Sequence, residues 1–253
     1  MVFGFARWQK AEPAAAAVPR GVRVYAVGDV HGRLDLLDQL LDRIEADART
    51  AGDRARYLVF LGDYVDRGPQ SRGVIERLIA GPPPGFGAIH LKGNHEASFL
   101  GFLEDVRVGP GWFRYGGLAT LASYGVTPPP EDAPVERLLQ VQGDLREAVP
   151  PHHQRFLERL KPSVTIGDYV FVHAGVRPGV PLPRQKETDL LWIREEFLKS
   201  NVDHGKVVVH GHTISIEPEL RGNRIGIDTG AYATHRLTCV VLEDTDRRFL
   251  TTA

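Results

Sequence analysis

Five short clusters of Asp, His and Asn, each beside glycine, have residue types that suit catalysis. Each cluster follows an apolar run. Counted from Asp29 to Asp63 and from Asp63 to Asn94, the first three clusters are 34 and 31 residues apart. This spacing is about the length of one strand-plus-helix unit. The clusters occupy residues 28–32, 62–68, 93–96, 173–175 and 210–213.

These clusters combine oxygen and imidazole ligands. Such a set suits Mn²⁺, Fe or Zn²⁺, whereas Ca²⁺ takes nearly all-oxygen ligands and structural zinc usually takes thiolates. Five or six ligands exceed what one ion needs when positions are left for water, so we expect two ions that share a carboxylate. Two ions roughly 3.5–4 Å apart can bind both the attacking and the leaving oxygen of a displacement at phosphorus.

The elements that carry the clusters alternate as strand and helix. Apolar runs predict strands over residues 22–27, 57–61 and 86–91, and helical spacing of apolar residues predicts helices over 34–44 and 74–79. This order favours parallel strands at the centre of a layered α/β domain. The carboxyl ends of such strands share one edge, so the clusters should meet there. Further strands are predicted over 169–172, 207–209, 224–227 and 237–242.

Residues 1–20 are predicted to be an N-terminal tail, and residues 21–253 a single domain. Within it, residues 97–161 are rich in aromatic residues and glycine and have two helical patterns, which indicates a helical insertion or cap. We expect Trp112, Phe113 and Tyr115 of this segment to pack inside it rather than to contact a substrate.

Composition excludes several classes of protein. The 31 Lys+Arg and 32 Asp+Glu give a net charge of −1, which does not favour nucleic acid or an anionic membrane as partner. Cys239 is the single cysteine and fits a reducing compartment. No apolar run approaches the ~20 residues of a membrane span, and residues 1–20 have no signal-peptide core. We therefore expect a cytoplasmic protein without nucleic-acid or membrane partners. Its oligomeric state is open.

Taken together, the five clusters resemble the signature of the calcineurin-like metallophosphoesterases. Gly-Asp-Tyr-Val-Asp-Arg-Gly at 62–68 is similar to the phosphoprotein phosphatase branch, and the segment 112–125 is similar to bacterial serine/threonine protein phosphatases. The resemblance covers residues 22–242 and implies the metallophosphoesterase fold, an α/β sandwich of two mixed sheets flanked by helices. The matching motifs are Asp29-x-His31, Gly62-Asp63-x-x-Asp66-Arg67-Gly68, Gly93-Asn94-His95-Glu96, His173-Ala174-Gly175 and Gly211-His212-Thr213.

The resemblance also implies a role for each matching residue. Asp63 would bridge two divalent ions, of which Mn²⁺ is expected first and Fe or Zn²⁺ are the alternatives, and a hydroxide bridging the ions would attack phosphorus. His95 would be the general acid and Asp66 would orient it. Arg67 would bind the substrate phosphate, and Arg194 would do so on a shorter match. The implied ligands are Asp29, His31 and Asp63 for one ion, and Asp63, Asn94, His173 and His212 for the other.

The sequence leaves open the roles of three residues near these motifs. His210 stands where many relatives carry arginine. Asp228 and Tyr232 follow a predicted strand, and for them a turn cap and a packed ring are as reasonable as a place beside the cleft.

The first functional hypothesis is a phosphomonoesterase acting on phosphoserine and phosphothreonine in proteins, or on phosphotyrosine. The alternative is a symmetrical dinucleoside polyphosphate hydrolase, since those bacterial enzymes share the five motifs. A catalytically silent scaffold is a third hypothesis. The intact set of ligands, acid and orienting Asp argues against it.

Overall fold

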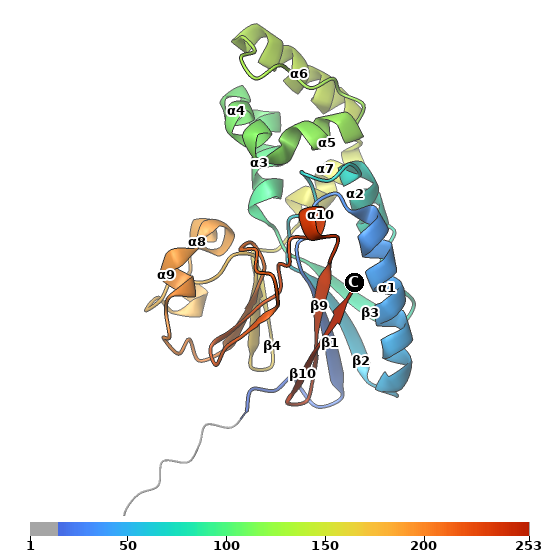
Figure 1. Ribbon diagram of the computed structural model, residues 1–253, viewed down its shortest axis with the longest axis vertical. Helices are drawn as coiled ribbons and strands as arrows, with labels where there is room; N and C mark the ends of the chain where they lie inside the picture. Colours follow the sequence, from blue (N-terminus) through green and yellow to red (C-terminus); the bar gives the residue numbers. More distant parts are fainter. Residues whose placement is uncertain (1–14, 253) are drawn as a thin grey trace, which may run out of the picture.

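Two mixed β-sheets of five strands each pack face to face in the computed structural model, which describes residues 15–252 (Figure 1). The first sheet has the order β10-β9-β1-β2-β3 and the second β4-β5-β6-β8-β7. The strands of the first are β1 (Val22–Val27), β2 (Ala55–Phe60), β3 (Phe86–His90), β9 (Thr238–Glu243) and β10 (Asp246–Thr251). Those of the second are β4 (Ser163–Ile166), β5 (Tyr169–Val172), β6 (Val207–His210), β7 (Glu219–Leu220) and β8 (Arg224–Gly226).

Parallel pairing occupies the centre of each sheet. In the first sheet, β1 pairs with β2 and β2 with β3 in parallel, which confirms the expectation from the βαβαβ order. In the second, β5, β6 and β8 are parallel. Antiparallel strands complete the sheets: β9 and β10 beside β1, and β4 and β7 at the two edges of the second sheet.

Alternation along the strands divides the core into layers. In β1, Val24 and Ala26 point between the two sheets, whereas Tyr25 and Val27 face the helices on the other side. Helices α1 (Leu34–Ala48) and α2 (Ser71–Ile79) cover that outer face. Helices α8 (Glu187–Trp192) and α9 (Glu195–Leu198) lie against the outer face of the second sheet. The result is the predicted sandwich of two mixed sheets flanked by helices.

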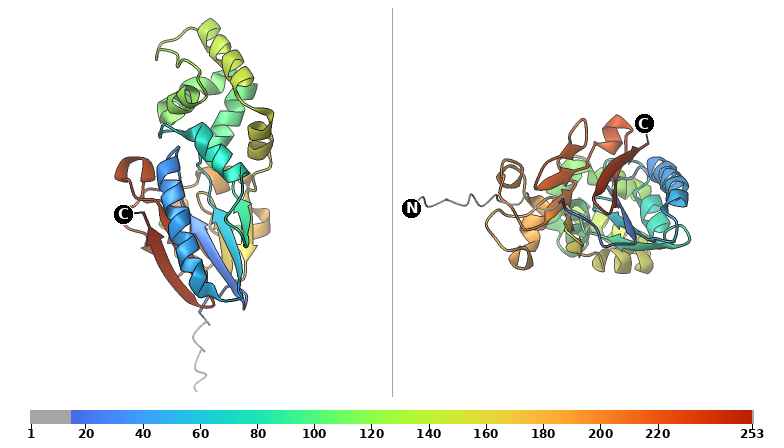
Figure 2. Two further views of the ribbon diagram at one scale, coloured as in Figure 1. Left: turned by 90° about the vertical axis from the view of Figure 1, so that its right-hand side faces the viewer. Right: turned by 90° about the horizontal axis from the view of Figure 1, so that it is seen from below.

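A group of helices stands at one end of the sandwich (Figure 2). It comprises α3 (Asn94–Glu104), α4 (Gly109–Trp112), α5 (Leu118–Ser123), α6 (Val135–Ala148) and α7 (Pro151–Glu158). Between α4 and α5 the chain turns through one π-helical turn, Phe113–Gly117, in which Gly116 has φ 113°. Gly116 lies against the loop that carries Asp66 and Arg67. Its carbonyl accepts the N–H of Arg67 (3.2 Å), and a Cβ on Gly116 would collide with Arg67.

The remaining elements differ from the sequence predictions or extend them. Strands β4, β7 and β10 were not predicted, and helix α10 (Ala231–Thr234) precedes β9.

Of the predicted tail, residues 1–14 lie outside the described residues. Val18 is buried between the sheets, and the carbonyl of Ala17 accepts the N–H of Asp168 (2.8 Å), so packed contacts begin ahead of residue 21. No helix within residues 15–252 is long and apolar enough to cross a membrane.

Candidate active site

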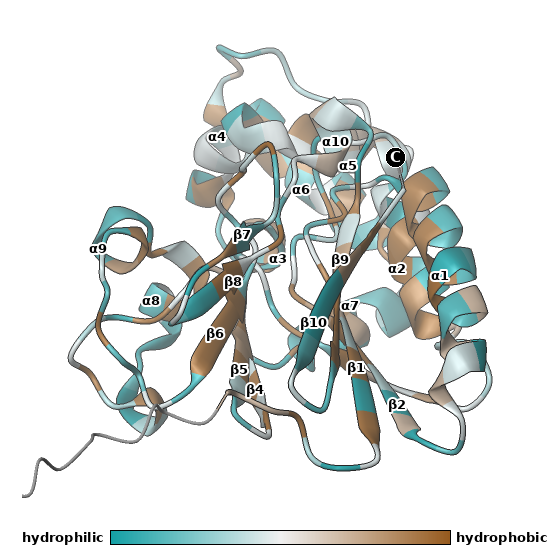
Figure 3. Ribbon diagram, turned by 60° about the horizontal axis from the view of Figure 1, so that its bottom comes forward, coloured by the Kyte–Doolittle hydropathy of each residue, from teal (hydrophilic) through white to brown (hydrophobic). Residues whose placement is uncertain are grey.

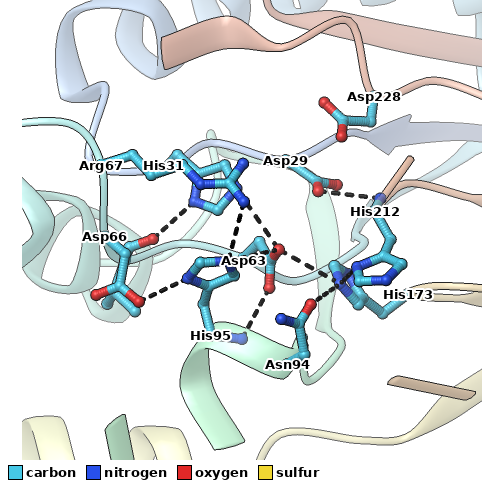
Figure 4. A network of polar contacts seen from close by, with 12 residues as sticks. Asp29, His31, Asp63, Asp66, Arg67, Asn94, His95, His173, His212 and Asp228 are labelled. Atoms are coloured by element: carbon cyan, nitrogen blue, oxygen red, sulfur yellow. Dashed lines mark hydrogen bonds and ion pairs between the residues drawn. The ribbon is translucent and has the colours of Figure 1, made fainter. Parts of the chain in front are cut away.

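Asp63 lies at the centre of a buried group of polar side chains beyond the carboxyl ends of the parallel strands (Figure 4). Its Oδ2 atom is 3.5 Å from Nε2 of His31 and 3.4 Å from Nε2 of His173. Its Oδ1 atom accepts a hydrogen bond from the backbone N–H of His95 (3.1 Å), in the first turn of α3. Because a helix N-terminus favours negative charge, α3 and the histidines together stabilise this carboxylate.

A second set of contacts extends from His173. Its Nε2 atom is 2.8 Å from Oδ1 of Asn94 and 3.2 Å from Nδ1 of His212. The backbone N–H of His212 donates to Oδ2 of Asp29 (3.0 Å), which links the two sheets across the site. The structure therefore brings together all six residues that the sequence predicts as ligands, namely Asp29, His31, Asp63, Asn94, His173 and His212.

The loops that present these side chains have unusual backbone conformations. The φ angle is 46° at His31, 52° at Asp63 and 63° at His212, and Asp66 and Arg67 also have positive φ. A left-handed conformation costs a non-glycine residue about 1–2 kcal/mol. Such strain persists only where surrounding contacts hold it, and it is concentrated at functional sites.

A buried carboxylate, Glu96, holds the Asp63 loop in this conformation. It accepts hydrogen bonds from the backbone N–H groups of Gly93 (2.9 Å), Asp63 (2.8 Å) and Tyr64 (2.7 Å). Burial and the neighbouring charge of Asp63 raise the pKa of Glu96 to about 7. The motif that contains Glu96 predicts no role for it, although an acidic residue at the third position of a helix is the signal of an N-terminal cap.

The ligand atoms of the group fit a metal ion. Within residues 15–252, the buried atoms Oδ1 of Asp29, Nε2 of His31 and Nε2 of His212 have no hydrogen-bond partner. Buried polar atoms are rarely left unpaired. Gly211 packs so closely against Asp29 that a Cβ on it would collide with the carboxylate. Free carboxylate and imidazole atoms around Asp63 suit Mn²⁺, Fe or Zn²⁺, so these Asp and His residues can bind metals.

The charges of the site lead to the same conclusion. Burial and the nearby carboxylates of Asp228 and Asp63 raise the pKa of Asp29 well above its usual range. Burial lowers the pKa of His31 to about 3, and it also lowers the pKa of His212. Neutral imidazole is the form that binds metals. A cation among these residues would relieve the repulsion between the carboxylates.

His95 and Asp66 form a buried pair beside this group. Nδ1 of His95 lies 2.6 Å from Oδ2 of Asp66. Burial lowers the pKa of His95, but the charge of Asp63 and the hydrogen bond with Asp66 more than offset this, so its pKa is raised above its usual value. The protonated ring of His95 is thus stabilised relative to a free histidine, and this is the form in which a histidine can donate a proton.

The helical insertion fixes Asp66. Nε1 of Trp112 donates to Oδ2 (2.7 Å), and the hydroxyl of Thr120 donates to Oδ1 (2.6 Å). The N–H of Asp66 donates to the hydroxyls of Thr120 and Ser71. The sequence does not predict these partners. Trp112 packs against Phe99, in agreement with the prediction that it is a packing residue, but its N–H also makes this polar contact.

The two predicted phosphate-binding arginines line one pocket of about 510 Å³ beside the site. Nη2 of Arg67 is 3.3 Å from Nε2 of His95, and its guanidinium lies 4.7 Å from the ring centre of Tyr232. Nη1 of Arg194 donates to the carbonyl of His212 (3.2 Å). The other residues that line the pocket are Asn94, His95, Ser98, Val108, Gly111, Trp112, Tyr115 and Trp192. A larger hollow, lined by Asp168, Lys206 and Arg247 among others, contains none of the predicted site residues.

The three open residues have distinct positions. His210 is buried with its ring 5.1 Å from that of Phe197, and it lies outside the ligand groups found in the described residues. Asp228 is buried near Asp29, and burial raises its pKa. Tyr232 packs on His31 as well as on Arg67. The prediction that Tyr115 packs inside the insertion was wrong: it is 64% exposed and lines the pocket.

Comparison with known proteins identifies the family. The sequence profile described as "Calcineurin-like phosphoesterase" matches residues 22–238, most of the chain. The chain belongs to this family. This match confirms the resemblance inferred from the five motifs. Calcineurin-like phosphoesterases are metal-dependent hydrolases of phosphate esters.

The relatives of this phosphoesterase carry two kinds of name. The asymmetrical bis(5'-nucleosyl)-tetraphosphatase PrpE of Halalkalibacterium halodurans is 26% identical over 231 residues, 85% of this chain and 87% of that one. Serine/threonine-protein phosphatase 2 of Escherichia coli is 26% identical over 226 residues, 85% of this chain and 90% of that one. A solved structure described as "a putative diadenosine tetraphosphatase" has a TM-score of 0.62 at 22% identity, covering 94% of this chain and 98% of that one, which supports the fold.

Proposed function

We propose that this phosphoesterase uses two divalent ions, with Mn²⁺ the first expectation. Asp29, His31 and Asp63 would hold one ion, and Asp63, Asn94, His173 and His212 the other. When bound, such ions lower the pKa of water from 15.7 toward about 7 and polarise the phosphoryl oxygens. The observation that carries the proposal is the buried His95–Asp66 pair, which lies beside a carboxylate surrounded by unpaired ligand atoms.

In this proposal the protein's own residues donate one proton and bind the phosphate oxygens of the substrate. His95 donates the proton on Nε2 to the leaving oxygen, while Asp66 at Nδ1 stabilises the imidazolium. Arg67, 3.3 Å from that Nε2, binds the phosphoryl oxygens next to the acid. Arg194 lines the same pocket and binds a second phosphate or a second oxygen, because a guanidinium offers paired donors.

The pocket beside His95 favours a nucleotide as the rest of the substrate. It is lined by two largely exposed aromatic side chains, Trp192 (49% exposed) and Tyr115 (64%), together with both arginines. Stacking on an aromatic ring stabilises a nucleobase by about 1–3 kcal/mol. Arginines beside aromatic rings suit a polyphosphate that ends in a nucleoside. We therefore place dinucleoside polyphosphates first among the substrates, in line with the names of several relatives.

A phosphoprotein is the second candidate. It was the first hypothesis from the sequence, and a relative of nearly full coverage is named a serine/threonine-protein phosphatase. A side chain bearing phosphate could enter the same pocket, with its peptide lying across Tyr115.

The experiment that tests the choice compares kcat/KM of the Mn²⁺-loaded protein on diadenosine tetraphosphate and on a phosphothreonine peptide. We expect preference for the dinucleotide. Products resolved by chromatography show the position of cleavage: two ADP for symmetrical cleavage, AMP and ATP for asymmetrical cleavage. Preference for the peptide would reject the nucleotide proposal and leave the metal site and the acid unaffected.

A further inference from the structure

A second group of potential ligands lies away from the candidate active site, where α7 packs against α2. It consists of Glu76 of α2 and the adjacent His152 and His153 of α7. Nε2 of His153 is 2.8 Å from Oε1 of Glu76, and Nε2 of His152 is 3.3 Å from both of its carboxylate oxygens. The two rings meet edge to face with their centres 4.5 Å apart. Two imidazole nitrogens thus converge on one carboxylate.

His153 is oriented toward that carboxylate from inside the protein. Its side chain is fully buried, and its Nδ1 atom is 2.8 Å from the hydroxyl of Tyr124. Its buried Nε2 atom points to Oε1 of Glu76, an ion-pair contact, and has no other partner in the described part of the chain. An imidazole held at one nitrogen by a neighbouring group, with the other nitrogen directed at a second ligand residue, has the arrangement of a metal-binding histidine.

We propose that Glu76, His152 and His153 form a third, mononuclear metal site that takes a transition-metal ion, with Zn²⁺ as the expected ion. Two histidines and one carboxylate are a common zinc ligand set, with bonds of about 2.0–2.2 Å. In a tetrahedron of such bonds, neighbouring ligand atoms lie about 3.3 Å apart, close to the 2.8 and 3.3 Å that separate the histidine nitrogens from Glu76. The fourth position faces solvent, since the side chains of Glu76 and His152 are 46% and 45% exposed.

The site would tie together two elements that support the active-site loop. Helix α2 begins at Ser71, whose hydroxyl accepts the N–H of Asp66 (3.0 Å). Tyr124, which holds His153, ends helix α5, and α5 carries Thr120, the partner of Asp66. An ion bridging α2 and α7 would therefore stabilise the packing around Asp66 without touching a substrate.

Metal counting tests the proposal. Wild type, Glu76→Gln and His152→Ala are stripped with a chelator, loaded with excess Zn²⁺, desalted and analysed by mass spectrometry for zinc per chain. Both substitutions are at partly exposed side chains, so folding should survive, and circular dichroism checks it. Glu158→Gln, on the exposed side of the same helix α7, is the control. We expect one zinc more per chain in wild type and control than in either variant.

The readout is the difference in zinc per chain between wild type and each variant. It therefore does not depend on how many ions the active site holds or on any activity. A thermal unfolding scan gives a second readout: Zn²⁺ should raise the Tm of wild type more than that of Glu76→Gln. Tyr124→Phe keeps the ring but removes the hydroxyl, and it should weaken zinc binding at this site about 10–100-fold. Equal zinc counts in wild type, Glu76→Gln and His152→Ala would overturn the proposal.

Discussion

Nδ1 of His95 lies 2.6 Å from Oδ2 of Asp66, and both side chains are buried at the edge of the ligand group around Asp63. The carboxylate fixes the ring so that Nε2 faces Arg67 and the pocket. It also stabilises the protonated ring. This contact therefore orients the proposed acid and, together with the charge of Asp63, favours its protonated form.

Removing the acid should matter only when the leaving group needs a proton. We expect His95→Ala to slow hydrolysis of an alkyl phosphate by about 10²–10⁴-fold. Hydrolysis of p-nitrophenyl phosphate should fall much less, because p-nitrophenolate is a stable anion. Steady-state kinetics on the two esters, at equal metal content, give the ratio. Equal losses on both esters would exclude His95 as the acid.

Removing the orienting carboxylate should change the pH profile. Together with the charge of Asp63, the hydrogen bond with Asp66 raises the pKa of His95, so Asp66→Asn should lower that pKa. The acid is active when protonated. Its activity is present at low pH and is lost as pH rises through this pKa, so the alkaline limb of kcat should move to lower pH. Asp38→Asn removes a surface partner of Arg77 and should leave the limb in place.

Asp66 in turn depends on the insertion. Thr120→Val removes a hydroxyl that donates to Oδ1 of Asp66 and accepts a hydrogen bond from the backbone N–H of Asp66. Leaving such buried groups unpaired costs about 1–3 kcal/mol. We expect kcat to fall about tenfold or more, with metal content unchanged. Thr120→Ser retains the hydroxyl and should restore kcat. A rise in KM with kcat unchanged, or no rescue by Ser, would contradict a role through Asp66.

The shared ligand should govern metal content. Burial tends to raise the pKa of Asp63, but His173 and His95 hold it well below its usual range, so the carboxylate is ionised. Asp63→Asn removes that charge from between both proposed ion positions. The variant should bind fewer than two Mn²⁺ per chain in equilibrium dialysis, while Asp53→Asn on the surface should match wild type. Full occupancy in Asp63→Asn would show that this residue does not bridge.

The exposed aromatic residues should set substrate preference. Trp192→Ala should reduce kcat/KM for diadenosine tetraphosphate by about 5–150-fold, the equivalent of one stacked base. p-Nitrophenyl phosphate has no base to stack and should be affected little. Ile216→Ala changes an apolar side chain that is 87% exposed and outside the pocket, and it serves as control. An equal loss on both substrates would mean that Trp192 supports the site generally.

The central strands and their helices were predictable because their signals are local. Val22–Val27 is apolar except for Arg23, and Leu37, Leu40 and Ile44 recur at helical spacing. Strand β10 has no such signal. It begins Asp246-Arg247-Arg248, and this first part is teal in Figure 3, whereas β6 is brown. It becomes a strand by pairing with β9. Strand β7, of two residues, is too short to leave a pattern.

The ligand group was predictable because each member sits in a motif at a strand end. The partners of Asp66 were not, because Thr120 is 54 residues away and reaches Asp66 only once the insertion has folded over the loop. The role of Trp112 was also hard to predict. Its ring packs against Phe99 as an apolar residue would, and the same ring donates a hydrogen bond to Asp66. Tyr115 follows it by three residues yet is exposed, because the π-helical turn rotates it away from the core.

Metal-dependent turnover tests the central claim most directly. Wild type and Asp63→Asn are stripped with a chelator and assayed on p-nitrophenyl phosphate with and without added Mn²⁺. We expect no turnover by stripped wild type, restoration when Mn²⁺ is added, and little restoration in Asp63→Asn. If fully loaded, folded wild type hydrolysed neither this ester nor diadenosine tetraphosphate nor a phosphothreonine peptide, the group around Asp63 would be a metal-binding scaffold and the proposed catalytic function would be wrong.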